Sequence, residues 1–390
     1  MKKHRSQDKL LKIYTISVIL AFGLLFYANA EAQEAPDGTV VHLGLGKSFY
    51  APCALALMCS FFIKRKYDAI EATLYGLILL TIISTLIHPP FSSNVLEWTT
   101  TRFIFAILCF RDLRNVSPVV FIKYLSIASP LIVLPHYVLS DPFSFGVYRY
   151  GGFYGDANFL ALALNFIIVI CYLSIKMNKR QWIRLCALTS IFGSIPLILV
   201  GMSRGGLLGL FLIMLFIMTD SFKKNKKAIV LLSILLLVAL YPIFLEIEGV
   251  FGQIEERFTE GNANARIEGI VSAINVLTNK PELIPFGIGP GNTVHMMSYY
   301  KQFGYICAYV IHNTFFSILY EMGIFACILY VSLYIRTFYR LHRQRHFLLM
   351  GLLLSSALSL FTLPGHAFMP GWILLFFLSN HRIYLAYGSK

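Results

Sequence analysis

Long uninterrupted apolar runs constrain this chain more than any other feature of its sequence. The runs extend over about 16–22 residues, the length that an α-helix needs to cross the hydrocarbon core of a bilayer. The strands of a membrane β-barrel would instead alternate apolar and polar residues over about ten positions. Only 13% of the 390 residues are charged, and the mean hydropathy is +0.69. We therefore expect an all-α integral membrane protein.

The runs predict about 12 transmembrane helices in a single polytopic membrane domain, residues 1–390. The expected spans lie near 12–30, 46–63, 69–87, 92–110, 117–139, 157–175, 182–201, 205–220, 227–245, 312–335, 347–363 and 368–386. An alternative concerns the first span, because "YANAEAQ" (27–33) resembles a signal-peptidase site. Cleavage there would leave eleven spans with unchanged sidedness, but the apolar run is long for a signal sequence.

Lysines and arginines lie in short clusters between the runs, and 24 of the 33 fall in alternate connections on one side. The positive-inside rule makes that side, with both termini, cytoplasmic. The opposite side holds Lys47, Arg149, Arg204, Arg257, Arg266, Lys280 and Lys301. The net charge of +14 is therefore an orientation signal, and we expect a lipid bilayer and no nucleic acid as partner.

One connection on the outer side is much longer than the rest, and it covers residues 246–311, between spans nine and ten. Within it, the sequence near 264–278 reads as an amphipathic helix, started by Asn262 or Asn264 and ended by Lys280-Pro281. Its expected apolar stripe, against the membrane surface or the other spans, comprises Ile267, Ile270, Val271, Ile274 and Leu277.

The same loop offers further candidates for chemistry. Arg257 and Arg266 lie in a net acidic loop, so they either pair with neighbouring glutamates or bind a ligand. The glycines of "FGIGPGN" (286–292) indicate either backbone amides that approach an anion or, more simply, a turn-rich loop.

The loop ends in "VIHNTFFSILYEMG", where His312 and Asn313 precede the next span. The dipole at a helix N-terminus disfavours the imidazolium ion, and a neutral imidazole can accept a proton. His312 is thus either a general base or an interfacial residue with no chemical role. Glu321, nine residues later, points away from His312 on a helical wheel and is interpreted as structural.

Arg204, in "GMSRGGLLGL" (201–210), is the only charge in a long hydrophobic tract. An arginine in such a place is costly unless it faces water, a partner or a substrate. Helix packing alone can explain Gly205 and Gly209, which have small-xxx-small spacing, but it does not explain the arginine. In span four, Arg102 follows Glu97 by five residues, and the simplest expectation there is an ion pair.

These pieces together resemble the O-antigen ligase/polymerase superfamily. The resemblance rests on "SRGGLLGL" at the outer end of a span, on Arg257-Phe258 and a second arginine before a helix, and on "FGIGPGN" and "HN" opening the next span. "GGFYGDANFLAL" (151–162) resembles the glycine-aromatic-asparagine segment upstream in this family. Phe316 departs from the leucine that often follows the His-Asn pair, a change that affects packing more than chemistry.

The resemblance implies a GT-C-like glycosyltransferase of the bacterial inner membrane with its active site at the periplasmic face. Such an enzyme transfers a glycan from an undecaprenyl-diphosphate carrier to an acceptor sugar, on lipid A-core for a ligase or on another carrier for a polymerase. It needs no cofactor or metal, in keeping with outer loops that lack an Asp-x-Asp pair. The expected catalytic residues are His312 and Arg204. Those expected to bind the diphosphate or glycan are Arg257, Arg266, Arg149, Asn313 and Ser203.

Arginine suits the donor because it stays charged and binds phosphate oxygens bidentately. Two alternatives remain open at this point. A polymerase of O-antigen or exopolysaccharide would use the same donor chemistry as a ligase, which we favour slightly. A lipid-linked glycan flippase would also need cationic groups, but an outer histidine and several outer arginines favour an enzyme over a conduit.

Overall fold

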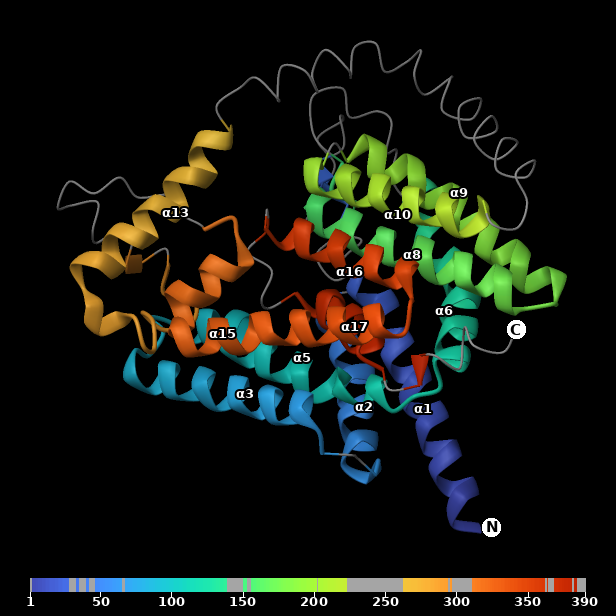
Figure 1. Cartoon of the computed structure of the whole chain (residues 1–390), viewed down its shortest axis with the longest axis horizontal. Coiled ribbons are helices and arrows are strands. Elements are labelled where there is room, and N and C mark those ends of the chain that lie inside the picture. Colours follow the sequence, from blue (N-terminus) through green and yellow to red (C-terminus); the bar gives the residue numbers. More distant parts are fainter. Residues whose placement is uncertain are drawn as a thin grey trace.

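The computed structural model describes residues 2–27, 33–34, 40–41, 46–64, 67–138, 150–152, 156–201, 203–222, 262–293, 295–296, 311–361, 363, 368–380 and 382–383. Helices dominate this part of the chain (Figure 1). The two strands described, β1 (Gln33–Glu34) and β2 (Val40–Val41), form one short antiparallel pair.

The first half of the chain contains α1 (Lys2–Leu25), the 3-10 turn η1 (Gly46–Phe49), α2 (Tyr50–Phe62), α3 (Ala69–Ile87), α4 (Ser93–Leu96), the π-helical turn η2 (Glu97–Thr101), α5 (Arg102–Phe110), the 3-10 turn η3 (Arg111–Arg114), α6 (Pro118–Val133), α7 (Pro135–Val138) and α8 (Ala157–Met177). The second half contains α9 (Gln181–Val200), α10 (Arg204–Phe222), α13 (Asn262–Asn279), the 3-10 turn η5 (Pro281–Leu283), α15 (Thr314–Arg343), α16 (Phe347–Leu360) and α17 (Met369–Leu378).

Each expected span except 227–245, which lies outside the described residues, contains helix. Among the described residues, five helical segments are long and apolar enough to cross a membrane: Ala69–Ile87, Pro118–Val138, Ala157–Met177, Gln181–Val200 and Thr314–Arg343. Shorter apolar helices occupy other expected spans, among them Phe347–Leu360 and Met369–Leu378. These helices are consistent with a multi-pass membrane protein, whereas the number twelve and the GT-C-like arrangement stay predictions.

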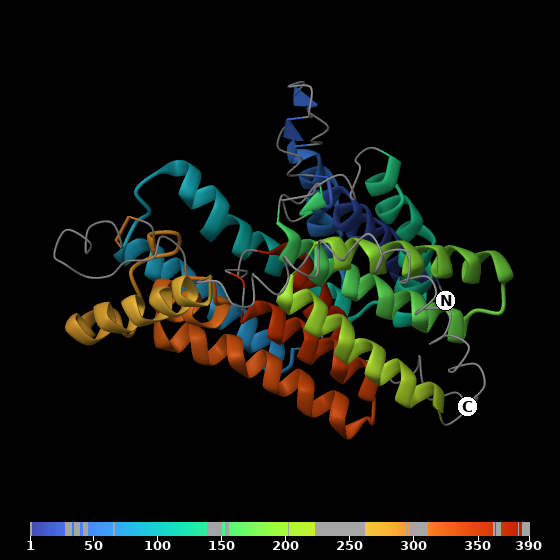
Figure 2. The ribbon, with the colours of Figure 1, turned by 90° about the horizontal axis from the view of Figure 1, so that it is seen from above.

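The helices pack lengthwise around α8, which is buried along most of its length. α6, α9, α10 and α16 pack against α8, while α3 packs along α15 (Figures 1 and 2). α13 lies beside the beginning of α15, away from the helices that surround α8.

The helical body has two ends that serve as reference points. α15 begins after Asn313 at one end, which we call the Asn313 end. It finishes beside the start of α3 at the other, which we call the Arg340 end because Arg340 lies 3.8 Å from Asp68, the residue before α3. Asn380 donates to the carbonyls of Leu113 and Val116, which brings further loops to the Arg340 end. Two of the basic segments expected on one side of the membrane, 111–114 and 336–345, therefore lie at one end.

Candidate active site at the Asn313 end

Ser203 fixes the beginning of α10 and therefore the backbone position of Arg204. Its buried hydroxyl accepts from the Gly206 amide at 3.0 Å, which is the bond of an N-cap, and donates to Asn158 Oδ1 at 2.7 Å. Asn158 belongs to the first turn of α8, which Asp156 caps by accepting from its amide. The two sequence segments that contain Asn158 and Ser203 thus meet through their side chains.

Glycine lets α10 lie close to its neighbours. A Cβ on Gly206 would overlap Ala161 of α8, and one on Gly209 would overlap Ser355 of α16. Asn165 donates to the Gly206 carbonyl at 3.1 Å in this crowded region. Close helix packing therefore accounts for Gly206 and Gly209, as the packing alternative expects of Gly209.

The segment after Arg149 joins the same region. The Tyr150 amide donates to the Val200 carbonyl at 3.4 Å, next to the turn that leads into α10. The Tyr150 hydroxyl lies 2.8 Å from Nδ1 of buried His136. Arg149 lies outside the described residues, but its neighbour in the chain is held against the end of α9.

His312 and Asn313 stand where α15 begins, as expected. Asn313 is buried and caps the helix, with its Oδ1 accepting from the amides of Phe315 at 3.0 Å and Phe316 at 3.1 Å. His312 is exposed immediately before the cap. Thr314 donates to the Leu363 carbonyl at 2.5 Å, which ties this start to the chain between α16 and α17.

A series of contacts connects the starts of α10 and α15. Ser203 contacts Asn158, and the next residue, Phe159, stacks on Phe368 with ring centroids 4.4 Å apart. Phe368 precedes α17, and the segment that leads to it contains Leu363, the partner of Thr314. The backbones that carry Arg204 and His312 consequently lie at the same end of the molecule.

The loop 284–292 packs into α15, and this contact was not predicted. α15 is broken at Gly323, where φ is 85° and ψ is 176°. The amides of Ile288 and Gly289 donate to the carbonyls of Tyr320 and Glu321 at 2.9 Å, and the Ile324 amide donates back to Ile284 at 2.8 Å. The loop therefore supplies the hydrogen bonds that the break removes from the helix.

These bonds decide between the two interpretations of "FGIGPGN" in favour of the turn-rich loop. The Gly287, Ile288, Gly289 and Asn292 amides all donate to carbonyls of the protein, so they offer no anion cradle. The glycines at 287, 289 and 291 have positive φ, and a Cβ on any of them would overlap α15, His88 or Val95. Glycine is required here for conformation and close packing.

The helix expected near 264–278 in the long loop is present as α13, and its apolar residues divide between a buried face and an exposed one. Ala273, Val276 and Leu277 are buried together with Leu283, Ile288, Ile311 and Tyr320. Val271 is 47% exposed and Ile274 45% exposed. The helix turns its smaller residues toward the loop and α15, which leaves two of the predicted apolar positions outside this contact.

The other arginines of the predicted site lie wholly or partly outside the description. Arg257 lies outside the described residues. The side chains of Arg204 and Arg266 also lie outside the description, although the backbone of Arg204 begins α10 and that of Arg266 lies within α13. Within the described residues, no group of three or more His, Cys, Asp and Glu side chains is placed to hold a metal ion.

Comparison with known families adds an independent finding. Residues 189–331 match the family model described as O-antigen ligase. The match begins in α9, and it includes Ser203 and Arg204 as well as His312 and Asn313. This match to part of the chain supports a place for it in the O-antigen ligase/polymerase superfamily. No curated protein matches the chain.

Members of the O-antigen ligase/polymerase superfamily are glycosyltransferase-like enzymes, and the family implies a lipid-linked glycan as substrate in a membrane environment.

Two polar residues that we predicted as glycan-binding, Ser203 and Asn313, are the caps of α10 and α15. The helix break at Gly323 had one signal in the sequence, a glycine in the middle of an apolar run, which the helical periodicity outweighed.

Glu321 and Glu97 both have partners within the protein. Glu321 is buried, accepts from Thr293 at 2.5 Å and lies at the break in α15, in agreement with a structural role. Glu97 forms an ion pair with Lys47 at 2.7 Å, a partner that was not expected. Arg102 lies over the ring of Phe49, 5.9 Å from its centroid.

Proposed function

We propose that the chain is a metal-independent glycosyltransferase of the bacterial inner membrane, O-antigen ligase in type. It transfers a glycan from undecaprenyl diphosphate to a sugar hydroxyl of lipid A-core at the periplasmic face. The observation that supports this best is the convergence of the starts of α10 and α15 with the Tyr150 segment. Two residue types that the reaction needs, arginine and histidine, begin or immediately precede these helices.

In this proposal, Arg204 stabilises the charge that develops on the leaving diphosphate. Its backbone occupies the first position of a capped helix, where the free amides and the helix dipole also favour an anion. A guanidinium stays charged and binds phosphate oxygens through two parallel N–H groups. We assign Arg149, Arg257 and Arg266 to further contacts with the diphosphate or the glycan.

His312 is the proposed general base. The acceptor hydroxyl oxygen forms a bond to the anomeric carbon while the bond between that carbon and the diphosphate oxygen breaks. The hydroxyl proton passes to a ring nitrogen of His312, and the electron pair of the broken bond leaves with the diphosphate. The exposed position of His312 before a buried cap gives an acceptor access to the imidazole.

The function is tested on surface glycolipid from a strain that lacks the gene. Bare core without repeats indicates a ligase, and core with a single repeat indicates a polymerase, which shares the donor chemistry. A normal ladder of glycolipid bands would contradict both roles in lipopolysaccharide. The remaining functions would be transport of a lipid-linked glycan or action on another glycan.

Complementation with His312→Ala tests the general base. We expect ligation to fall by about 10²–10⁴-fold, the usual contribution of a positioned base. His295→Ala, which removes another exposed histidine, is the matched control and should restore the ladder. Full rescue by His312→Ala at equal protein amount would rule out this role.

Complementation with Arg204→Lys tests bidentate binding. Lysine keeps the positive charge but carries it on one ammonium group, which cannot bind phosphate through two parallel N–H groups. We therefore expect ligation to fall roughly tenfold or more with the amount of protein unchanged. Wild-type ligation by this variant would remove the bidentate argument.

A further inference from the structure

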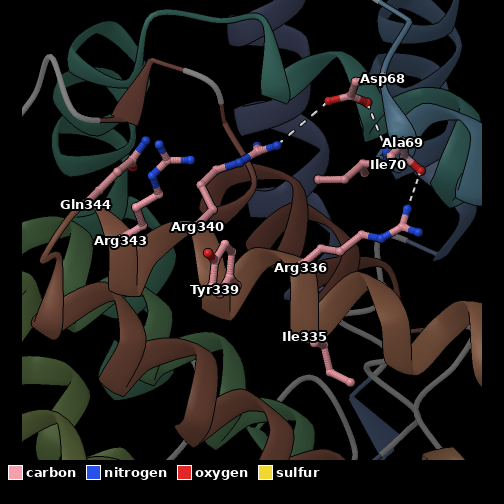
Figure 3. A pocket seen from close by; sticks show the side chains of 9 residues that line it. All are labelled: Asp68, Ala69, Ile70, Ile335, Arg336, Tyr339, Arg340, Arg343 and Gln344. Carbon is pink, nitrogen blue, oxygen red and sulfur yellow. Dashed lines mark hydrogen bonds and ion pairs between the residues drawn. The ribbon is translucent and has the colours of Figure 1, made fainter.

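A cavity of about 820 Å³ opens at the Arg340 end, far from the proposed active site. It lies between the beginning of α3 and the last turns of α15 (Figure 3). Its lining comprises Asp68, Ala69, Ile70, Ile335, Arg336, Tyr339, Arg340, Arg343 and Gln344.

The cavity is positively charged because three arginines face one carboxylate. Arg336, Arg340 and Arg343 follow one another at i, i+4 and i+7, so they share one face of α15. Asp68 is the acidic residue of the lining, and it already forms an ion pair with buried Arg114. It also accepts from two amides of α3 as the N-cap. Its negative charge is therefore shared and does not balance the three arginines.

The three arginines differ in how many of their N–H groups already bond within the protein. Arg340 donates to the Ser379 carbonyl at 2.5 Å and lies beside Asp68, so its guanidinium interacts mainly with other groups of the protein. Arg336 donates through Nη1 to the Ala69 carbonyl and to Thr73, at 2.6 and 2.7 Å. A guanidinium has five N–H donors, so Arg336 retains others.

Arg343 and Gln344 have capacity for a ligand. Arg343 is exposed and forms no hydrogen bond or ion pair with the described residues. Gln344 Oε1 is buried, and it has no hydrogen-bond partner in the described part of the chain. A ligand with phosphate oxygens and a hydroxyl would satisfy both side chains.

Apolar side chains run from the cavity along α15 toward the other end. Ile335 and Tyr339 line the cavity and are 62% and 66% exposed, and Ile328, two turns before Ile335, is 56% exposed. Further along α3, beyond the cavity lining, Leu79 and Leu86 are also exposed. Both α3 and α15 are long and apolar enough to span a membrane, so these faces suit acyl chains.

We propose that this cavity binds the headgroup of an anionic phospholipid, with Arg336 and Arg343 on its phosphate and its acyl chains along Ile335 and Ile328. Basic pockets between transmembrane helices are suited to such headgroups. The apolar face favours a lipid over a soluble phosphate ester, because a soluble ligand would leave that face unused. This proposal is independent of the glycosyltransferase reaction.

The test measures lipid binding to the purified full chain by native mass spectrometry. The probes are dioleoyl phosphatidylglycerol and dioleoyl phosphatidylcholine. We expect preferential binding of phosphatidylglycerol, weakened roughly tenfold in Arg336→Gln/Arg343→Gln. The matched control, Arg180→Gln, removes an exposed arginine outside the cavity and should leave binding unchanged.

Three results would overturn the proposal. They are equal binding of both lipids, an unchanged affinity in the variants, and equally tight binding of glycerophosphoglycerol without acyl chains. The last result would indicate a site for a soluble phosphate ester. The double variant can fail to fold, because Arg336 bonds to α3. In that case the lipid affinity of Arg343→Gln alone tests the proposal, since the Arg343 side chain has no bond to the described residues.

Discussion

At the scale of single residues, short polar side chains determine where the helices of the proposed site begin. Ser203 and Asn313 are both buried and both bond to backbone amides of the first turn. Their identity as caps could be predicted from the residue types, since serine and asparagine are favoured N-caps. Their burial could not, because it depends on Asn158 and Leu363, which are distant in sequence.

We expect Ser203→Ala to destabilise the start of α10 by about 1 kcal/mol and to reduce ligation through misplacement of Arg204. The measurement is the melting temperature of the purified protein together with the glycolipid ladder. Ser332→Ala is the matched control, since that hydroxyl only bonds within its own helix, to Leu329. A larger loss of stability in the control would contradict the cap assignment.

At the scale of elements, the break in α15 is the feature that most affects the neighbouring structure. Ser84 of α3 donates to the Glu321 carbonyl at 2.9 Å, and the loop 284–292 bonds to the same turn. α3, the loop and α15 are therefore joined at one point by backbone groups. An apolar run predicts a helix there but cannot indicate a break whose hydrogen bonds come from elsewhere.

Gly323→Ala should destabilise the protein strongly. An alanine at φ 85° is strained, and its Cβ would overlap the Pro285 carbonyl. We expect a loss of more than about 2 kcal/mol, measured as a fall in melting temperature. In Gly23→Ala, by contrast, the new Cβ would lie 3.6 Å from Ile132, an ordinary contact in a helix, so that variant should keep or slightly raise stability.

The turn between α15 and α16 should be sensitive to acid. Burial lowers the pKa of His346, which precedes α16. As the pH falls below about 6.5, the unfolded chain takes up a proton that the folded chain resists, so stability decreases. The melting temperature should fall less between pH 7.5 and 5.5 in His346→Gln than in the wild type. An equal fall would contradict this, and exposed His342→Gln serves as the comparison.

At the scale of the whole molecule, a buried ion cluster holds the Arg340 end together. Glu71 of α3 lies 3.1 Å from Arg114 and 3.6 Å from Arg111, and all three side chains are buried. Arg114 also pairs with Asp68, which lies near Arg340 of α15. The cluster therefore connects loops that the chain places far apart.

Glu71→Gln should cost about 3–5 kcal/mol, because it leaves two buried arginines poorly compensated. The measurement is thermal unfolding in detergent. Glu97→Gln breaks the partly exposed pair with Lys47 and should change the melting temperature little. Equal effects of the two variants would mean that burial of the cluster does not matter.

The sequence predicts the helices of this molecule better than their contacts. The predicted span 69–87 coincides with α3, and 157–175 ends two residues before α8 does, because long apolar runs determine both. Which face of a helix is buried is harder to predict, because the partner surface selects it. Val271 and Ile274 of α13, for example, are exposed. For the site, the positions of His312 and Asn313 at the start of α15 follow from the sequence, whereas their indirect connection to Ser203 depends on contacts of Leu363 and Phe368.

The break in α15 has a consequence for biogenesis. When α15 enters the membrane alone, the carbonyls of Tyr320 and Glu321 and the amide of Ile324 lack the partners that the loop 284–292 supplies. Unsatisfied backbone groups are costly in lipid, so we expect α15 to adopt its broken form in the membrane only when the loop docks. Substitutions at Gly287 or Gly289 should therefore reduce the amount of protein in the membrane before they alter turnover. A mutational scan that scores only glycan output would mistake this assembly site for a catalytic one.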